Sequence, residues 1–320
     1  MTTVDSMKSE SKTRDVLSCI GNTTLLPLRN IVATNGCRIL LKLEGENPTG
    51  SMKDRMALTM IASAESDGRL EPNGSVVEYT TGNTGSALAL VCCVKGYALD
   101  IVTSDAYSPE KREHMKKLGA TLHIVKSDNG RMTEQLTRDI IDRARVIAGQ
   151  PGRFWTDQMN NTDQLLAYQT MADEIWIQTD RQIDAFVQVV GTAASVRGTG
   201  EALRRYNNRI AVVAVEPAES AVLSGGPSGA HKIDGMGAGY VVPLWHANIA
   251  DQIETVSTAD ALTMSARLAR EEGLLAGPST GANIVAALRV AERLGPDGTV
   301  VTVMCDTGMK YLSGLHGCSS

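Results

Sequence analysis

The stretch Val76-Val77-Glu78-Tyr79-Thr80-Thr81-Gly82-Asn83-Thr84-Gly85 contains the pattern on which the fold depends. Its first four residues have the β-branched and aromatic character of a strand. Its last six are small, polar and rich in glycine, which is typical of a loop. Apolar residues at helical spacing follow, from residue 85 to residue 95. A strand that passes through a polar loop into a helix is the repeating unit of parallel α/β proteins.

The same alternation continues on both sides of this unit. Apolar, β-branched runs predict strands over residues 39–43, 76–79, 101–103, 122–125, 185–190, 210–215 and 300–305. Helical spacing predicts helices over residues 52–66, 85–95, 109–118, 133–148, 163–177, 258–272 and 282–294. Strands that alternate with helices form parallel sheets covered on both faces, so the sequence predicts an α/β fold. The irregular polar stretch 154–163 is where we expect the chain to cross between two lobes.

Composition excludes several classes of function. The chain has 320 residues, with 31 Lys+Arg against 36 Asp+Glu, so its formal net charge is −5. This charge offers no basic surface for nucleic acid, and aromatic residues, at 4%, are too few for base-stacking platforms. No apolar run approaches the ~18 residues that a membrane-spanning helix needs. We expect one large domain or two, with no nucleic-acid and no membrane partner.

The cysteines and the first residues bear on metal binding and compartment. The six cysteines form no C-x-x-C pair, and no histidine stands at the spacing of a metal ligand, so we expect neither a metal site nor a disulfide framework. Residues 1–14 are polar and lack the apolar core of a secretory signal. We therefore expect a cytoplasmic protein.

Five loops are dense in Gly, Ser, Thr and Asn. They span residues 45–55, 80–85, 191–195, 277–281 and 306–308. Two-lobed α/β proteins bind ligands at the carboxyl ends of their strands, where such loops lead into helices. We expect these loops to surround one ligand site.

The third loop, Gly191-Thr192-Ala193-Ala194-Ser195, follows a predicted strand and opens a helix. Backbone N–H groups and hydroxyls at a helix N-terminus hold phosphate through directed hydrogen bonds and the helix dipole. The loop matches neither a P-loop nor a dinucleotide fingerprint, so a lone phosphate fits better than ATP or NAD. A plain strand-to-helix turn is the alternative interpretation of this loop taken alone.

Lys53 lies within the first turn of a predicted helix, beside a polar loop. A lysine there can have its pKa lowered by the helix terminus and by burial, and such lysines form Schiff bases. By position alone, a solvated surface lysine is the more ordinary interpretation. A Schiff-base lysine together with a single-phosphate site points to pyridoxal 5′-phosphate.

Ordered motifs along the chain resemble those of the pyridoxal-phosphate enzymes typified by cysteine synthase and cystathionine β-synthase. The motifs lie at residues 20–23, 47–55, 80–85, 216–217, 231–239, 277–281 and 306–313. The resemblance implies a two-lobed, three-layer α/β/α fold with mostly parallel sheets, of the tryptophan-synthase-β type known as fold type II. It implies a smaller mobile lobe over residues 47–159, which binds the substrate carboxylate. Residues 1–46 with 160–320 would form a larger lobe with the cofactor-phosphate and pyridine-nitrogen sites, and two chains would form a homodimer.

The resemblance also implies roles around the cofactor. Lys53 would carry pyridoxal 5′-phosphate and then remove the α-proton of the substrate. The phosphate would be held by Gly191, Thr192, Ala193, Ala194 and Ser195. Asn83 would hydrogen-bond the phenolic oxygen of the cofactor. Ser279 would face the pyridine nitrogen, with Thr307 as a rival hydroxyl and Asp306 as a rival carboxylate.

For the substrate, the resemblance implies binding of the amino acid carboxylate by Thr80, Thr81, Asn83, Thr84 and Gln158, with Gly235 in the facing loop. A hydroxyl at the pyridine nitrogen makes the ring a weaker electron sink than a carboxylate does, which favours loss of a β-substituent. The implied reaction is β-replacement on an activated L-serine through an α-aminoacrylate, with O-acetyl-L-serine and sulfide giving L-cysteine and acetate.

Alternatives to this reaction stay open. The same chemistry serves O-phosphoserine as substrate, homocysteine as nucleophile giving cystathionine, or an amine giving a diaminopropionate-type amino acid. Serine or threonine dehydration is a third possibility, and a catalytically silent regulatory binding module is a fourth.

The chain departs from the family pattern at particular positions. Ala193 and Ala194 replace common glycines, and a Cβ at a residue with positive φ is costly. Thr81 stands where serine is usual, Cys305-Asp306 replaces a proline-containing approach to the last loop, and Met309-Lys310 replaces an acidic-basic pair. These changes leave the cofactor chemistry intact and bear on the particular substrates.

Overall fold

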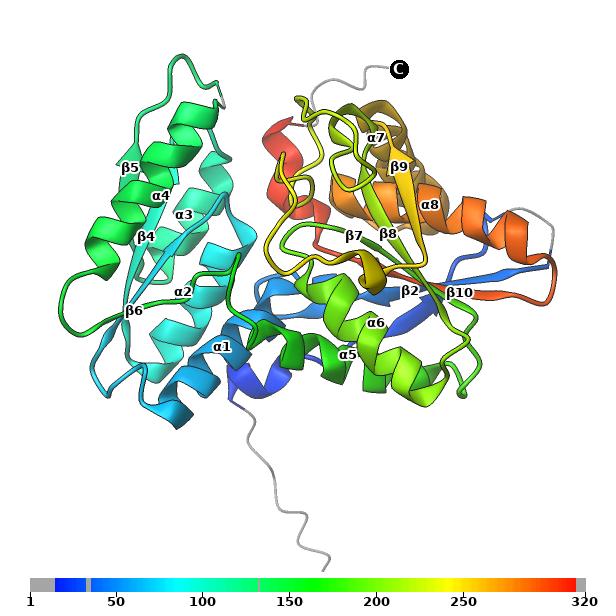
Figure 1. Ribbon diagram of the computed structural model, residues 1–320, viewed down its shortest axis with the longest axis horizontal. Helices are drawn as coiled ribbons and strands as arrows, with labels where there is room; N and C mark the ends of the chain where they lie inside the picture. Colours follow the sequence, from blue (N-terminus) through cyan, green and yellow to red (C-terminus); the bar gives the residue numbers. More distant parts are fainter. Residues whose placement is uncertain (1–14, 33–35, 132, 315–320) are drawn as a thin grey trace, which may run out of the picture.

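The computed structural model describes residues 15–32, 36–131 and 133–314. The strands form two separate sheets that lie side by side, each with helices on both faces (Figure 1). Residues 1–14 of the larger predicted lobe lie outside the described residues. Among the described residues, no helix has the length and apolar character needed to cross a membrane.

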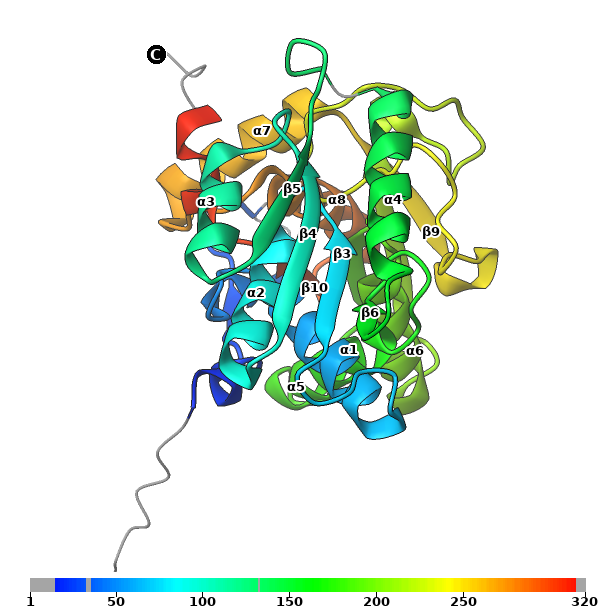
Figure 2. The ribbon, with the colours of Figure 1, turned by 90° about the vertical axis from the view of Figure 1, so that its left-hand side faces the viewer.

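The smaller sheet has four strands, all parallel, in the order β5-β4-β3-β6 (Figure 2). These are β3 (Ser75–Tyr79), β4 (Ala98–Ser104), β5 (Thr121–Val125) and β6 (Arg153–Trp155). One face is covered by α1 (Lys53–Asp67), α2 (Asn83–Lys95) and α3 (Pro109–Lys117), and the other by α4 (Glu134–Ala148). Val76 packs toward the first group of helices and Val77 toward α4, because successive side chains of a strand alternate between faces.

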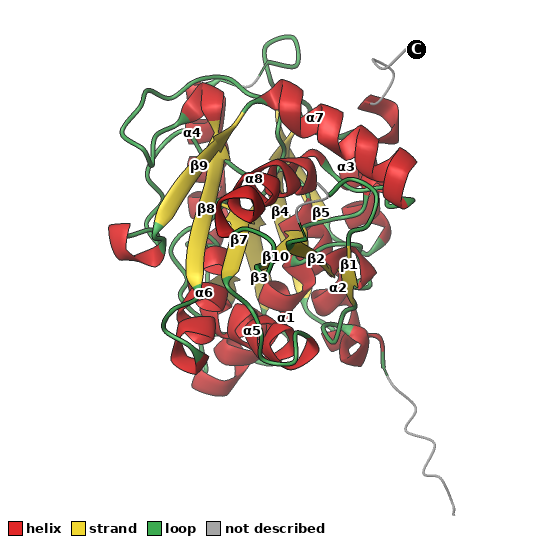
Figure 3. Cartoon of the chain, turned by 90° about the vertical axis from the view of Figure 1, so that its right-hand side faces the viewer, coloured by secondary structure: helices red, strands yellow, loops and turns green. Residues whose placement is uncertain are grey.

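The larger sheet has six strands in the order β1-β2-β10-β7-β8-β9 (Figure 3). They are β1 (Leu25–Pro27), β2 (Arg38–Leu43), β7 (Ala185–Val189), β8 (Ala211–Pro217), β9 (Gln252–Val256) and β10 (Thr299–Met304), of which β1 alone is antiparallel to its neighbour. One face is covered by α5 (Gln164–Gln178) and α6 (Ala194–Tyr206), the other by α7 (Thr258–Arg267) and α8 (Pro278–Leu294). Strands β7 and β10 are buried along their whole length, as expected for central parallel strands.

Local sequence explains where several helices begin and end. Ser108, Thr133 and Ser257 cap α3, α4 and α7 by accepting backbone N–H bonds. Gly68 and Gly96 end α1 and α2 in the left-handed conformation. The remaining short helices are η1 (Val16–Cys19), η2 (Glu44–Glu46), η3 (Ala218–Ser220), η4 (Ala247–Ile249), η5 (Leu268–Glu272) and η6 (Gly308–Gly314).

The predicted α/β fold with mostly parallel sheets is confirmed, with differences in detail. The sequence patterns missed β1, β6 and β9, because two of them have three residues and β9 mixes polar with apolar residues. The expected helix over 258–272 ends at Arg267 and continues as one π-turn, η5. The helix expected from residue 282 begins at Pro278, because proline at the first position of a helix lacks only an N–H that would be unpaired anyway.

Candidate active site

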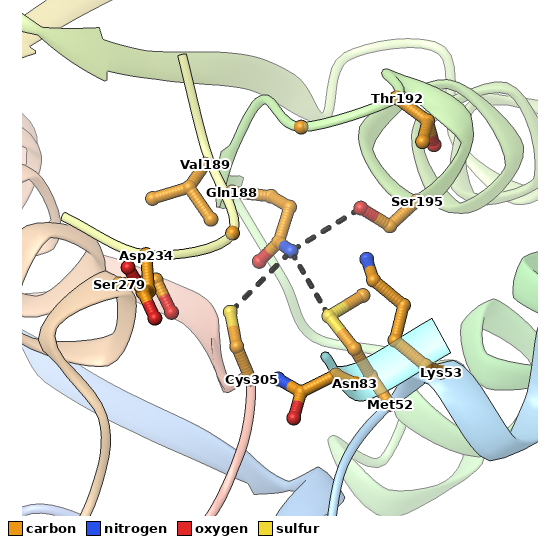
Figure 4. Close-up of a pocket in the computed structure, with 12 residues that line it drawn as sticks. Met52, Lys53, Asn83, Gln188, Val189, Thr192, Ser195, Asp234, Ser279 and Cys305 are labelled. Atoms are coloured by element: carbon orange, nitrogen blue, oxygen red, sulfur yellow. Dashed lines mark hydrogen bonds between the residues drawn. The ribbon is translucent and has the colours of Figure 1, made fainter. Parts of the chain in front are cut away.

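A pocket lies where β3, β7 and β10 end and their loops lead into helices or turns (Figure 4). It is lined by Met52, Lys53, Asn83, Gln188, Val189, Gly191, Thr192, Ser195, Asp234, Gly235, Ser279 and Cys305. Four of the five polar loops singled out in the sequence contribute to this lining. The two sheets therefore bring together residues that lie more than 200 positions apart in the chain.

Lys53 is the first residue of α1, and its side chain points into the pocket (Figure 4). Burial lowers the pKa of its ammonium, although the nearby Cys305 and Asp306 act in the opposite direction. In the part of the chain that the structure describes, no ion pair involves this ammonium. A lysine in this state supplies a neutral amine for nucleophilic attack or for proton transfer more readily than a surface lysine does.

A cradle for an anion lies in the same pocket as Lys53. Thr192 and Ser195 carry hydroxyls at the N-terminus of α6, a helix of 13 residues. Gly191 allows a close approach of backbone, since a Cβ there would lie 2.5 Å from the carbonyl oxygen of Gly235. Hydroxyls, backbone N–H groups and a helix N-terminus together are the donor set that phosphate prefers.

The two alanines of this loop differ in conformation. Ala193 has a φ of 71°, which lies in the left-handed region. This conformation is energetically unfavourable for an L-residue that carries a Cβ. Ala194 is the first residue of α6 and has helical geometry. The strain expected at both positions is therefore confined to Ala193.

Replacing Ala193 with glycine is expected to stabilise the protein by about 1 kcal/mol, because glycine adopts positive φ without steric cost. Ala194→Gly is the matched control, and it should lower stability by about 1 kcal/mol because glycine is unfavourable in a helix. Urea unfolding of the three proteins without added ligand measures both effects. Equal changes for the two variants would show that the conformation of Ala193 carries no strain.

At the far end of the pocket, Ser279 alone among the three predicted candidates is a lining residue. Asp306 is buried outside the lining and accepts hydrogen bonds at Oδ2 from Asn83 Nδ2 (2.7 Å) and Tyr311 Oη (2.6 Å). Thr307 lies against Gly50, whose carbonyl oxygen accepts from its backbone N–H (2.9 Å). Of these three candidates, only the neutral hydroxyl of Ser279 therefore lines the pocket.

Five lining residues were not predicted as site residues from the sequence: Gln188, Cys305, Asp234, Met52 and Val189. Gln188 is buried in β7, where its Nε2 approaches Ser195 Oγ (3.2 Å) and its Oε1 accepts from Asn283 Nδ2 (3.0 Å). Burial raises the pKa of Cys305 to about 11, so its thiol is protonated at neutral pH. Asp234 precedes Gly235 and pairs with Lys111 Nζ at 2.9 Å. A polar residue inside the apolar run Ala185-Phe186-Val187-Gln188-Val189 was the signal for the first of these.

Most of the predicted carboxylate-binding residues lie beside the pocket without lining it. Thr84 Oγ1 donates to Gln158 Oε1 (2.7 Å), and Thr80 Oγ1 accepts from the backbone N–H of Gly82 (3.0 Å). Thr81 is exposed. Asn83 and Gly235 are the members of this set that line the pocket. Ala193, Ala194 and Thr307, predicted around the cofactor, are likewise outside the lining.

The buried carboxylate of Glu78 connects the segment before the 80–85 loop to the segment that carries Gln158. Glu78 accepts hydrogen bonds from Thr156 Oγ1 (2.7 Å) and from the backbone N–H groups of Gln158 (2.9 Å) and Tyr79 (2.8 Å). Burial raises the pKa of Glu78 to about 7 despite these bonds. Glu78 thereby joins the end of β3 to the segment that carries Gln158.

Comparison with known proteins identifies the family to which this chain belongs. The sequence profile of the family described as "Pyridoxal-phosphate dependent enzyme" matches residues 16–306. The chain belongs to the pyridoxal-phosphate-dependent enzymes. This confirms the resemblance, and the cofactor of the family is pyridoxal phosphate.

Individual members of the family are similar over most of their length. A cysteine synthase from Staphylococcus aureus (strain Mu50 / ATCC 700699) is 39% identical over 301 residues, which are 93% of this chain and 95% of that protein. A crystal structure of O-acetyl serine sulfhydrylase isoform 3 from Entamoeba histolytica has a TM-score of 0.90 at 36% identity, covering 100% of this chain and 96% of the other. A crystal structure of O-acetylserine-dependent cystathionine β-synthase from Helicobacter pylori has a TM-score of 0.86 at 31% identity, covering 93% and 96%.

The residues present fit pyridoxal phosphate in this enzyme. The pocket is lined by a lysine with a lowered pKa and by a phosphate-type donor set, and the absence of a Cβ at Gly191 lets this loop approach the backbone of Gly235. Both parts belong to one pocket, as a Schiff-base lysine and a single phosphate require.

Proposed function

We propose that this chain catalyses β-replacement on an activated L-serine, with O-acetyl-L-serine and sulfide giving L-cysteine and acetate. The observation that carries the proposal is one pocket that is lined by Lys53, by the hydroxyls at the N-terminus of α6 and by the Ser279 hydroxyl (Figure 4). The 39% identity with a cysteine synthase supports the same reaction.

Lys53 Nζ is the proposed base that takes the α-proton of the substrate and later returns it. Its lowered pKa favours this role, because a general base works best when its pKa lies near the working pH. Bound pyridoxal phosphate would supply the electron sink for this step, and a hydroxyl such as Ser279 at the pyridine nitrogen keeps that sink weaker than a carboxylate would.

The other roles are proposed residue by residue. Gly191, Thr192, Ala193, Ala194 and Ser195 would hold the cofactor phosphate, and Asn83 the phenolic oxygen. The substrate carboxylate would be bound by Thr80, Thr81, Asn83, Thr84 and Gln158, with Gly235 opposite. Two of these residues, Thr84 and Gln158, are hydrogen-bonded to each other, which supports a shared role in binding the carboxylate.

The lobe assignment, the oligomeric state and the compartment extend the proposal. Residues 47–159 would form the smaller, mobile lobe that carries the carboxylate-binding loop, and residues 1–46 with 160–320 the larger one. The four-stranded sheet lies within the first range and the six-stranded sheet within the second, which supports this division. The resemblance to cysteine synthases favours a homodimer in the cytoplasm.

A panel of substrates tests the reaction. The purified, cofactor-loaded protein is mixed with O-acetyl-L-serine or O-phospho-L-serine, each with sulfide, homocysteine or a diamine, and the products are identified by mass spectrometry. We expect O-acetyl-L-serine with sulfide to give L-cysteine faster than any other pair. Turnover of threonine alone would favour a dehydratase, and the absence of any product would favour a silent binding module.

Cystathionine formation is the second candidate, because a structural relative with a TM-score of 0.86 is an O-acetylserine-dependent cystathionine β-synthase. The homocysteine arm of the panel distinguishes it from cysteine formation. Faster turnover with homocysteine than with sulfide would replace the leading proposal by this one.

A further inference from the structure

The side-chain amide of Asn83 is held at both ends by the C-terminal segment of the chain. Its Nδ2 donates to Asp306 Oδ2 at 2.7 Å, and its Oδ1 accepts from Lys310 Nζ at 2.8 Å. Asn83 is the first residue of α2, whereas Asp306 and Lys310 follow the last strand of the other sheet. These two contacts therefore cross between the sheets.

The chemistry of the two partners allows one orientation of the amide. A lysine ammonium only donates hydrogen bonds, and an ionised carboxylate only accepts them. A reversed amide would place its nitrogen against the ammonium of Lys310 and its carbonyl oxygen against the carboxylate of Asp306. Both hydrogen bonds would then become repulsive contacts.

Burial strengthens the contacts that Lys310 and Asp306 make with the Asn83 amide. Lys310 is 8% exposed and Asp306 is 1% exposed, so water screens neither contact well. Burial lowers the pKa of Lys310 to about 8, with Asp306 and Asp54 acting against the shift, so the side chain is mainly an ammonium at pH 7. The Tyr311 hydroxyl also donates to Asp306 Oδ2 (2.6 Å) and holds that carboxylate in place.

We infer that Lys310 and Asp306 are positioning residues that orient Asn83 so that its amide presents a donor, and not an acceptor, to the pocket. Nδ2 has two hydrogens, and the contact with Asp306 uses one. Figure 4 shows the amide oxygen of Asn83 turned away from the centre of the pocket. The inference rests on the proposed function, in which the remaining N–H would donate to the phenolic oxygen of pyridoxal phosphate.

The two positioning residues act redundantly, and this predicts a non-additive result. In Lys310→Met the carboxylate of Asp306 still requires the amide nitrogen, and in Asp306→Asn the ammonium of Lys310 still requires the amide oxygen. In the double variant, the asparagine introduced at position 306 can turn its own amide to match either orientation, and the methionine introduced at position 310 has no preference. Only the double variant therefore frees Asn83 to turn its oxygen toward the phenolic oxygen.

The test is the absorption spectrum of the cofactor-loaded proteins at pH 7. A donor at the phenolic oxygen favours its ionised form, which absorbs in the visible, whereas an acceptor favours the protonated form, which absorbs in the near ultraviolet. We expect the double variant to lose more of the visible band than the two single variants lose together. Lys310→Arg combined with Asp306→Asn retains a donor at position 310 and should keep the spectrum of the Asp306→Asn variant, and Lys116→Met on the exposed side of α3 is the surface control.

Each outcome bears on a different claim. The inference would be overturned if the double variant lost no more of the visible band than the two single variants lose together, or if no variant lost any of it. The proposed function would remain intact in either case. A wild-type protein without a visible band would refute the proposed function, and the inference with it. If the double variant does not fold, as judged by circular dichroism, Lys310→Gln replaces Lys310→Met, because a glutamine keeps a polar group in the buried site and can face either end of the amide.

Discussion

Replacing Lys53 with alanine is expected to abolish covalent attachment of pyridoxal phosphate and to lower β-replacement activity by about 10³-fold or more. Alanine removes both the amine that would bind the cofactor and the proposed base at Nζ. The measurement is the loss of the visible absorption band, together with the absence of a cofactor-modified peptide after borohydride reduction. Activity with O-acetyl-L-serine and sulfide gives the rate.

Two control variants separate the chemistry of Lys53 from its charge. Lys53→Arg keeps a cation at the start of α1, but a guanidinium stays protonated and cannot act as nucleophile or base, so it should be as inactive as alanine. Lys95→Ala removes a half-exposed lysine that pairs with Glu65 and should leave spectrum and rate unchanged. A visible band that survives in Lys53→Ala would assign the attachment to another residue.

Arg55→Met is expected to lower the free energy of unfolding by about 3–5 kcal/mol, because it leaves the buried Glu44 carboxylate without its Arg55 partner and Glu174 with Lys42 as its remaining cation. Arg55 donates to both oxygens of Glu44 (2.7 and 2.8 Å) and to both oxygens of Glu174 (2.7 Å each). Glu44 is fully buried and Arg55 is 4% exposed. Urea unfolding at pH 7 measures the loss. Arg138→Met, which breaks an exposed pair with Glu134 on α4, should change stability by less than about 1 kcal/mol.

The same variant has a distinct dependence on pH. Although burial opposes the shift, Arg55 and, to a smaller extent, Lys42 lower the pKa of Glu174 to about 2. A carboxyl whose pKa is lower in the folded than in the unfolded protein stabilises the fold above the unfolded value of about 4.5, and this contribution is lost as the pH falls toward 2. The stability difference between wild type and Arg55→Met should therefore shrink between pH 4.5 and pH 2. A constant difference would show that Arg55 acts through packing and not through charge.

Local patterns were sufficient for the fold class and for the long elements. Buried parallel strands such as β7 and β10 are continuous apolar runs, and α1 through α4 carry helical spacing within their own sequence. The short strands β1 and β6 and the polar-mixed β9 have no such signature, because their pairing depends on a neighbouring strand that is already in place.

The candidate site was predictable where its chemistry is local. Lys53 at the start of a helix and the hydroxyls of Thr192 and Ser195 after a strand are each recognisable within a few residues, and the structure places all three in one pocket. Cys305 was visible in the sequence as a departure from the family, without any indication that its thiol faces the pocket. Gln188 stood out only as a polar residue in an apolar run, and the structure was needed to show that it lies at the end of β7 that meets the pocket.

The amino-acid sequence was enough to specify an α/β chain with a lysine, a phosphate-type loop and the motifs of its enzyme family, because each of these is written in neighbouring residues. The packing of the two sheets decided the rest: that Ser279 and not Asp306 or Thr307 lines the pocket, that Ala193 and not Ala194 has a positive φ, and that Lys310 meets Asn83. The Lys310–Asn83 contact joins residues 227 positions apart. Such contacts depend on how the helices and loops of one sheet approach those of the other, and no local pattern of polar and apolar residues encodes that distance.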